Sequence, residues 1–208
     1  MAGVAALRGR FITLEGVDGA GKSSHIPWIA ERLRARGHEV VETREPGGTP
    51  LAEKLRRRVL AEHMDPVSET RLMFEARADH VQKVIEPALA RGAWVLCDRF
   101  TDSTIAYQGA GKGVDLAFIE ELARKIQPNL KPDLTLLFDA PYTVSSQRLN
   151  TSGRSLDRFE SEDQGFFERV RAAYRVLAAA EPGRVRIIDG SRAPSDVKAE
   201  VEKCLLND

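Results

Sequence analysis

Gly16-Val17-Asp18-Gly19-Ala20-Gly21-Lys22-Ser23 decides the fold of this 208-residue chain, because it fits the pattern G-x-x-x-x-G-K-[ST] of a phosphate-binding loop. The apolar stretch Phe11-Ile12-Thr13-Leu14 precedes it and a helical stretch follows it, which is the context that the pattern requires. The glycines let backbone N–H groups point inward, Lys22 reaches the β- and γ-phosphates, and the Ser23 hydroxyl ligates Mg²⁺. The sequence therefore predicts a triphosphate site. An incidental glycine-rich turn is disfavoured, and so is a dinucleotide site, whose glycine spacing is G-x-G-x-x-G.

Short β-rich stretches alternate with helical ones along the rest of the chain. The predicted strands cover 11–14, 39–43, 94–97, 134–138 and 185–188, and the predicted helices cover 22–36, 50–61, 69–91, 116–125 and 166–180. Several strands are continuous apolar runs, which is typical of strands covered on both faces, and the helices are long enough for crossovers. The predicted fold class is α/β, a three-layer sandwich with a five-stranded parallel sheet of the P-loop NTPase type.

Two segments and one proline depart from this regular pattern. Residues 150–164 are polar and rich in charge, and we expect a mobile lid there that closes over a ligand. The glycine-rich segment 109–113 lacks the spacing of a second phosphate loop, and we expect a flexible loop. Pro27 removes a backbone hydrogen bond inside the first helix, so we expect a kink or a helix that becomes regular only after it. No shift in composition marks a second domain, and residues 1–208 are predicted to form one.

Charge and composition exclude several classes of protein. Lys and Arg together number 31, as do Asp and Glu, so no global basic field attracts nucleic acid or a membrane surface. Residues 1–10 contain no apolar h-region, and no apolar run approaches the roughly 18 residues of a membrane span. The two cysteines, Cys97 and Cys204, are too few for a metal cluster or a disulfide framework. We therefore expect a cytoplasmic protein without nucleic-acid or membrane partners.

Residues at the carboxyl ends of the predicted strands indicate what receives a phosphoryl group. Asp98-Arg99-Phe100 places a carboxylate for Mg²⁺ and a guanidinium for an acceptor phosphate at the end of the third strand. The alternative is an ordinary Asp–Arg surface pair. On a predicted helix, Arg77 shares a face with Met73 and Phe74. This face is suited to stacking and reading a nucleobase, unless the apolar pair faces the core and Arg77 faces solvent.

These motifs together resemble those of the bacterial thymidylate kinases. The resemblance extends over nearly the whole chain and depends on five segments in order, 16–23, 43–49, 98–100, 106–109 and 157–160. Apart from the phosphate loop, no single segment carries it. It implies an enzyme that transfers the γ-phosphoryl group of ATP, with Mg²⁺, to dTMP. The product is dTDP, a step in dTTP synthesis for DNA precursors, and the family implies a homodimer whose substrates are small molecules.

The resemblance also implies roles for single residues. For the acceptor it implies contacts from Asp18 (deoxyribose 3′-hydroxyl), Glu45 and Pro46 (the loop beside the phosphate), Arg56 and Arg99 (acceptor phosphate), Arg77, Thr104 and Gln108 (thymine edge) and Tyr107 (sugar). Similar enzymes have Phe four residues before the base-reading arginine, where this chain has Met73 followed by Phe74, so either side chain covers the thymine. For the donor, Arg148 and the loop after Asp189 hold adenine. Gly19 stands where some thymidylate kinases have an arginine, and the resemblance to the bacterial type implies that Arg154 or Arg158 of the lid closes over the phosphates.

The expected reaction is in-line transfer, in which Lys22, Mg²⁺ and a lid arginine stabilise charge while Arg99 orients the acceptor. It needs no general base, because the acceptor oxygen of dTMP is already an anion. The four histidines, at 25, 38, 63 and 80, show no metal-ligand spacing and are interpreted as ordinary helix or surface residues. A GTPase is disfavoured because a guanine-reading N-K-x-D segment is missing.

Two alternatives stay open. One is another nucleoside monophosphate kinase, or a deoxynucleoside kinase, on the same scaffold. The other is a regulatory module that binds nucleotide without turnover. The set of Arg77, Thr104 and Gln108 argues against the first, and the presence of Asp98 and Arg99 argues against the second.

Overall fold

Five parallel strands form one sheet in the order β2-β3-β1-β4-β5 in the computed structural model, which describes residues 8–206. The strands are β1 (Phe11–Glu15), β2 (Val40–Arg44), β3 (Trp94–Asp98), β4 (Leu134–Asp139) and β5 (Val185–Asp189). All five predicted strands and the α/β fold class are thereby confirmed. Residues 1–7 and 207–208 lie outside the described part, and with them most of the expectation about residues 1–10 and the ends of the predicted domain.

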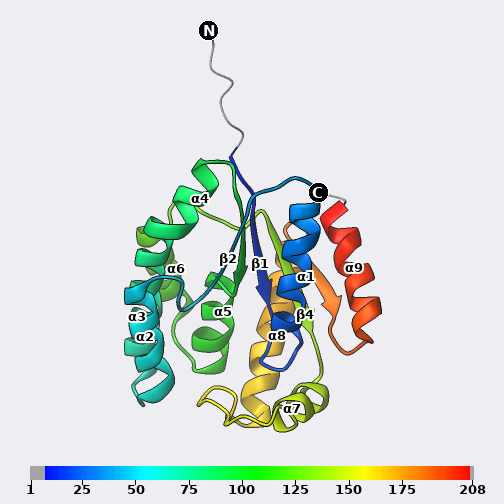
Figure 1. Cartoon of the computed structure of the whole chain (residues 1–208). Helices are drawn as coiled ribbons and strands as arrows, with labels where there is room; N and C mark the ends of the chain where they lie inside the picture. Colours follow the sequence, from blue (N-terminus) through cyan, green and yellow to red (C-terminus); the bar gives the residue numbers. More distant parts are fainter. Residues whose placement is uncertain (1–7, 207–208) are drawn as a thin grey trace.

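Helices cover both faces of this sheet, and Figure 1 shows α1 and α9 in front of it and α8 behind it. The helical elements are α1 (Lys22–Ala35), α2 (Pro50–Ala61), α3 (Pro66–His80), η1 (Val81–Ile85), α4 (Glu86–Ala90), α5 (Thr101–Thr104), η2 (Ile105–Gly111), α6 (Leu116–Ile126), α7 (Tyr142–Asn150), α8 (Gln164–Ala180) and α9 (Pro194–Leu206). Within residues 8–206, no helix combines the length and apolar character that crossing a membrane requires.

Each strand extends one residue beyond its predicted carboxyl end, and that residue is polar. The register pairs Leu14 with Asp98 and Glu15 with Leu137, so the ladder continues into these positions. Backbone pairing in a parallel sheet does not depend on side-chain polarity, which is why the apolar pattern stops early. Polar side chains are consequently gathered along one edge of the sheet, at the bottom of the molecule in Figure 1.

The long helix predicted for 69–91 is three consecutive elements, and it begins earlier than expected. Asp65 caps α3 by accepting from the backbone N–H of Ser68 at 2.9 Å, and Pro66 occupies the first turn, where its missing N–H costs nothing. A π-helical turn, η1, then precedes Pro87, and the N–H of Glu86 donates to the carbonyl of Val81. The first helix, in contrast, begins at Lys22 and continues through Pro27, so the alternative of a helix that becomes regular only after Pro27 is wrong.

The expectation of a flexible loop at 109–113 is wrong for its first three residues. Gly109 to Gly111 complete the π helix η2, which packs against α8. Gly111 is buried, and a Cβ atom there would lie 2.5 Å from the ring of Phe166 and 3.1 Å from Val170. Gly111 therefore permits the close approach of η2 and α8, and local sequence does not distinguish such a glycine from a loop glycine.

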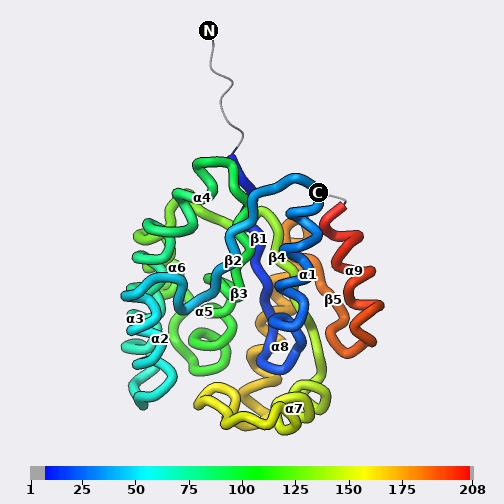
Figure 2. The backbone as a smooth tube through the Cα atoms, in the orientation of Figure 1, coloured from blue at the N-terminus to red at the C-terminus, as the bar shows by residue number. Residues whose placement is uncertain are grey.

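The main core lies between the sheet and the helices that cover it. Phe138 on β4 is fully buried in this core, and Phe11 on β1 and Phe100 just after β3 are fully buried in a second cluster. The segment 150–164 runs irregularly from the end of α7 to the start of α8, and its Phe159 packs into the main core. It is drawn in yellow in Figure 2 at the end of the molecule where α1 begins. The fold therefore places the predicted lid at the same edge as the phosphate loop.

Replacing Gly111 by alanine tests the close approach of η2 and α8. We expect Gly111→Ala to lower the free energy of unfolding by roughly 1–3 kcal/mol, because the added methyl group overlaps Phe166 in a packed region. Gly183→Ala is the control, since nothing lies within 4 Å of its Cβ position. Urea unfolding monitored by circular dichroism measures both, and equal stability of the two variants would contradict the packing argument.

Candidate functional site

The phosphate loop is held against the sheet by two close backbone contacts. Gly16 has φ 136°, and a Cβ atom there would lie 2.2 Å from the carbonyl oxygen of Phe138 on β4. Gly19 has φ 77°, and a Cβ atom there would lie 2.4 Å from the carbonyl oxygen of Ser145 on α7. Both positions need glycine for conformation and for space. The loop therefore has a fixed shape before any ligand arrives.

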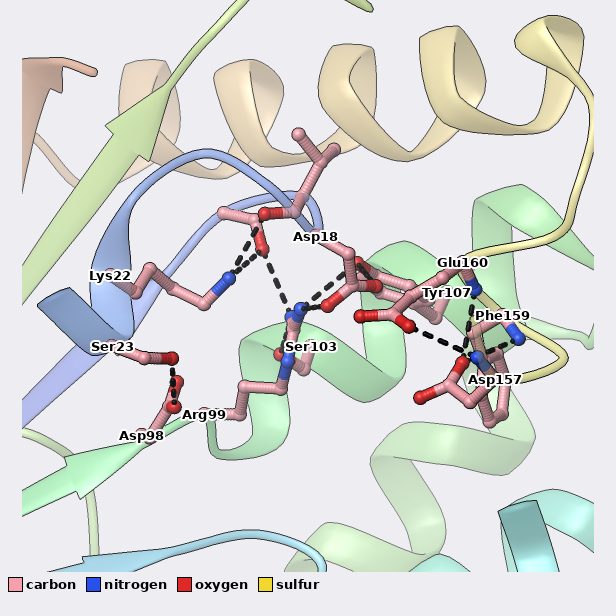
Figure 3. A network of polar contacts seen from close by, with 12 residues as sticks. Asp18, Lys22, Ser23, Asp98, Arg99, Ser103, Tyr107, Asp157, Phe159 and Glu160 are labelled. Carbon is pink, nitrogen blue, oxygen red and sulfur yellow. Dashed lines mark hydrogen bonds and ion pairs between the residues drawn. The ribbon is translucent and has the colours of Figure 1, made fainter. Parts of the chain in front are cut away.

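Lys22 lies inside the loop and is 5% exposed. Its Nζ donates to the carbonyl oxygens of Gly16 at 2.9 Å and Val17 at 3.0 Å (Figure 3). Burial, with a further contribution from Arg99, lowers the pKa of Lys22 to about 8. An anionic ligand in the loop favours the charged lysine and raises that pKa again.

Ser23 and Asp98 meet at the start of α1, at the end of β3. The Ser23 hydroxyl donates to Asp98 Oδ2 at 3.3 Å, and Asp98 Oδ1 is buried without a hydrogen-bond partner among the described residues. A hydroxyl beside an unpartnered carboxylate oxygen fits Mg²⁺, which prefers oxygen ligands and usually takes only one or two from protein. Residues 8–206 contain no group of three or more His, Cys, Asp or Glu side chains that would enclose a metal on their own.

Asp18 forms a closed cluster with Arg99 and Tyr107 (Figure 3). Arg99 Nη2 donates to Asp18 Oδ1 at 2.6 Å, the Tyr107 hydroxyl donates to Asp18 Oδ2 at 2.7 Å, and Arg99 Nη2 also donates to the Tyr107 hydroxyl at 3.0 Å. Burial alone raises the pKa of Asp18, but Arg99 and Lys22 outweigh it and hold the pKa below its usual value. The carboxylate is therefore anionic at neutral pH.

The backbone of Arg99 adopts φ 71°, which is unusual for a residue other than glycine. This turn carries the chain from β3 into α5 and directs the guanidinium back to the phosphate loop, where Nη1 donates to the carbonyl of Gly16 at 3.0 Å. Nη1 also donates to Ser103 Oγ at 3.1 Å and to the Tyr174 hydroxyl at 3.2 Å. Arg99 is thus oriented from both of its terminal nitrogens.

Glu15, at the end of β1, is fully buried and holds residues that contact Arg99. Its carboxylate accepts from the N–H of Phe100 at 2.7 Å, from Ser103 Oγ at 2.5 Å and from the Tyr174 hydroxyl at 2.9 Å. Burial, then the nearby charge of Asp102, raises the pKa of Glu15 to about 7. Neither Glu15 nor Tyr174 was predicted from the sequence; the only local signal was the position of Glu15 directly before the phosphate loop.

Two hollows meet beside this cluster. One is a cavity that opens to solvent, with about 620 Å³ of empty space when its open mouth is included, bounded among others by Pro46, Met73, Arg77, Thr104, Tyr107 and Gln108. The other is an open groove of about 1200 Å³ along the phosphate loop, bounded among others by Gly19, Lys22, Ser23, Asp98, Arg148 and Arg154. Five residues line both: Asp18, Glu45, Arg56, Arg99 and Asp157. The structure therefore brings nearly all the predicted acceptor and donor residues to two adjoining spaces.

Arg77 stands at the far end of the cavity and is 3% exposed. Its Nε donates to Glu45 Oε2 at 2.7 Å and its Nη2 donates to Thr104 Oγ1 at 3.0 Å. Its Nη1 is buried without a hydrogen-bond partner in the described part of the chain. Met73 lines the cavity, whereas Phe74 is buried beneath Arg77 and is not among the lining residues. Of the two candidate stacking residues, only Met73 is in reach of a ligand in the cavity.

The loop from Glu45 to Thr49 is anchored by a residue that the sequence analysis treated as ordinary. His80 is fully buried; its Nδ1 lies 2.9 Å from Glu45 Oε1 and its Nε2 lies 2.6 Å from the Thr43 hydroxyl. Arg56 Nη1 donates to the carbonyl of Pro46 at 3.0 Å. These contacts hold Glu45 and Pro46 against the cavity wall.

The two candidate lid arginines occupy different places. Arg154 is exposed, lines the groove beside the phosphate loop and pairs with Glu160, whose Oε2 accepts from Nη1 at 2.7 Å. Arg158 instead packs over the ring of Phe159 and contacts Glu69 and the carbonyl of Val59. Asp157 and Phe159, which the sequence analysis quoted without a role, line the cavity.

Arg148, on α7, contacts the phosphate loop and the loop after β5. Its Nη1 donates to the carbonyl of Gly190 at 2.8 Å and to those of Gly19 and Ala20 at 3.3 Å. It therefore ties α7 to the phosphate loop and to the loop after β5, the two segments that were expected to surround adenine.

Comparisons with known proteins agree with this geometry. The family model described as thymidylate kinase matches residues 14–201. The chain is similar to a thymidylate kinase of Bordetella petrii, with 56% identity over 93% of each chain, and to one of Methylobacillus flagellatus, with 56% identity over 94% of this chain and 96% of the other. Among solved structures it is similar to thymidylate kinase from Ehrlichia chaffeensis, with a TM-score of 0.78 and 34% identity over 95% of this chain and 99% of the other.

The raised pKa of Glu15 predicts a pH dependence of stability. Between pH 4.5 and 7 the folded state holds a proton on Glu15 that the unfolded state has released, so this group lowers the free energy of unfolding as the pH rises. We expect the wild type to lose on the order of 3 kcal/mol relative to Glu15→Gln across this range, and nothing further above it. Urea unfolding of both proteins at several pH values measures the difference, and a constant difference would contradict the assignment.

Proposed function

The chain belongs to the thymidylate kinase family and phosphorylates dTMP to dTDP with ATP, and on that premise we propose how its residues divide the reaction. The observation that carries the proposal is the junction of the two hollows at Asp18, Arg56 and Arg99. A donor in the groove and an acceptor in the cavity place their phosphates at this junction. Positioning of this kind supplies most of the catalysis in phosphoryl transfer.

The donor triphosphate occupies the groove. Gly16 to Gly21 provide backbone N–H groups, and Lys22 exchanges the carbonyls of Gly16 and Val17 for phosphate oxygens. Because the Lys22 side chain already lies in the loop, it has to move little when the nucleotide binds. Arg148 and the loop after Asp189 flank the adenine, which their mutual contact supports.

Ser23 and Asp98 would hold Mg²⁺. The unpartnered Oδ1 of Asp98 supports this assignment, because a buried carboxylate oxygen is costly without a partner. When bound, the ion neutralises charge on the donor phosphate oxygens. The pairing of Asp98 with Leu14 at the end of β3 fixes the backbone position of Asp98.

The acceptor dTMP occupies the cavity, with its phosphate on Arg99 and Arg56. Arg99 is already directed at the junction by Asp18, Gly16 and Ser103, so its entropy loss on binding is small. Asp18 then accepts from the deoxyribose 3′-hydroxyl while Tyr107 packs against the sugar, at a place where a 2′-hydroxyl is crowded.

The thymine ring lies at the far end, on Met73. Arg77 Nη1 donates to a carbonyl oxygen of the base, which satisfies a buried donor that the protein leaves unpartnered among its described residues. Thr104 and Gln108 also contact the edge of the thymine ring, and both line the cavity. Phe74 acts beneath Arg77 rather than on the base, with the guanidinium 4.6 Å above its ring.

Transfer is in-line and needs no protein base, because the attacking oxygen of the dTMP phosphate is an anion. Lys22 and Arg154 stabilise the charge that spreads over the transferring group. Arg154 leaves Glu160 to do so as the lid closes; Arg158 remains on the acceptor side with Glu69.

The chain is proposed to act as a homodimer in the cytoplasm. Val67 on α3 and Leu116 on α6 are exposed apolar residues on two helices that pack together, which supports this surface as the interface. The buried thiol of Cys97 and substrates drawn from the nucleotide pool support a reducing compartment.

The function is tested by ADP release with ATP and Mg²⁺ and one acceptor at a time: dTMP, dUMP, dCMP, dGMP, AMP, UMP or thymidine. We expect the highest kcat/KM with dTMP, because the cavity offers a base donor at Arg77 and a crowded sugar site at Tyr107. Turnover confined to another monophosphate would contradict the base assignment. ATP binding with no turnover on any acceptor would favour a regulatory module.

Separate alanine variants of Arg154 and Arg158 test the lid assignment. We expect Arg154→Ala to lower kcat by roughly 100-fold or more, since the transferring group loses a positioned cation. Arg158→Ala is expected to act mainly on the KM for dTMP, because this residue contacts Glu69 on the acceptor side. Single-turnover kinetics with saturating substrates separates the two effects. A larger loss of kcat in Arg158→Ala would reverse the assignment.

A further inference from the structure

Glu69 is a buried carboxylate that the proposed reaction does not use. It lies on α3, fully buried, two helical turns before Arg77. Its Oε1 accepts from Gln108 Nε2 at 2.8 Å, and its Oε2 accepts from Lys112 Nζ at 2.9 Å and contacts Arg158. Two cations and an amide therefore converge on one carboxylate that no water reaches.

Only one assignment of donors and acceptors fits this cluster. A carboxylate between two cations is an acceptor at both oxygens, so the group that Gln108 turns to Glu69 is its NH₂. The same contact with the amide reversed would set oxygen against oxygen in a buried site, which is strongly unfavourable. Gln108 also lines the acceptor cavity, so its carbonyl oxygen is the amide atom left for a ligand.

We propose that Glu69 is a specificity-determining residue that locks the amide of Gln108 with its carbonyl toward the base, so that the site accepts only bases with an N–H at the reading edge. This inference rests on the proposed function, because it concerns the base that the cavity receives. Glu69 does not touch the base; it acts through Gln108 and is a positioning residue.

The locked amide and Arg77 form a complementary pair. Arg77 Nη1 is a buried donor without a partner among the described residues, and Gln108 presents an acceptor. The imide edge of thymine or uracil offers the reverse, a carbonyl oxygen beside an N–H. Cytosine presents an amino group and an unprotonated ring nitrogen at the same positions, so both contacts fail with dCMP.

The isosteric change Glu69→Gln reverses this logic. Lys112 and Arg158 still require an acceptor, so the new amide turns its oxygen to them and its NH₂ to Gln108. Gln108 must then rotate to accept, and its own NH₂ faces the base. The site thereby loses its acceptor for the imide N–H and gains a donor that suits cytosine.

The experiment compares kcat/KM for dTMP, dUMP and dCMP in the wild type and in Glu69→Gln. We expect the dTMP to dCMP ratio to fall roughly 10- to 100-fold, the effect of reversing one buried hydrogen bond. The dTMP to dUMP ratio is expected to stay unchanged, because both bases present the same imide edge. A merely structural role for Glu69 lowers all three values together and leaves both ratios intact.

Two further variants complete the test. Lys112→Met removes one cation from Oε2 without reversing the Oε1 contact, and we expect the dTMP to dCMP ratio of the wild type. In the double variant Glu69→Gln with Gln108→Glu, the carboxylate at position 108 accepts from both the amide at position 69 and the base, and the preference for dTMP is expected to return. This double variant keeps a carboxylate in the cluster, so it decides the question even when Glu69→Gln alone does not fold.

The outcomes separate this inference from the function on which it rests. A wild type without preference for dTMP over dCMP would overturn the proposed base site, and the inference with it. A wild type that prefers dTMP, together with a folded Glu69→Gln that keeps the same ratio, would overturn the inference alone. A double variant that turns over dTMP and dCMP equally would do the same.

Discussion

The ion pair between Asp18 and Arg99 is the contact on which the rest of the site depends. It joins the phosphate loop after β1 to the turn after β3, with Nη2 and Oδ1 2.6 Å apart. These two strands are neighbours in the sheet, so the sheet register sets the distance between the donor and acceptor sides. Partial burial strengthens the pair and makes it costly to break, because either charge alone would be left poorly solvated and without a partner. The pair therefore holds the junction of groove and cavity at one geometry.

Three buried glutamates support the residues that line the two hollows, and each accepts hydrogen bonds from several partners. Glu15 accepts from a backbone N–H and two hydroxyls, Glu45 from Arg77 with His80 alongside, and Glu69 from Gln108 with two cations alongside. All three are at most 4% exposed. Glu45 and Glu69 face cations, and a carboxylate between cations is an acceptor, so each of these two fixes which way its partners direct their protons. The site thus has a defined arrangement of hydrogen-bond donors and acceptors as well as a defined shape. Selectivity for a base follows from this arrangement.

The lid divides into two parts with different attachments. Asp157 accepts from the N–H groups of Phe159 and Glu160, which gives this stretch a compact turn. On one side of the turn Arg154 is exposed and paired with Glu160, and on the other Arg158 is tied to Glu69 beneath the cavity. An exposed pair exchanges partners at little cost, whereas a pair with a buried carboxylate does not. The acceptor end of the lid is therefore the anchor, and the donor end is the part free to engage a triphosphate.

The sequence by itself determined the features that short-range patterns encode. The phosphate loop, the five strands and the place of Asp98 and Arg99 at the end of the third strand depend on neighbouring residues and on apolar periodicity, so they were predictable within a residue or two. The turn at Arg99, with φ 71°, was not predicted. The choice of Met73 over Phe74 was not, because consecutive helical residues differ by about 100° in direction and packing decides which one meets the cavity. Only the tertiary structure decided that Gly109 to Gly111 form a packed π helix and that Arg154 and Arg158 face different partners. Glu15, Glu69 and Tyr174 entered the site in the same way: their partners lie between 39 and 159 residues away, and no local pattern encodes contacts across such separations.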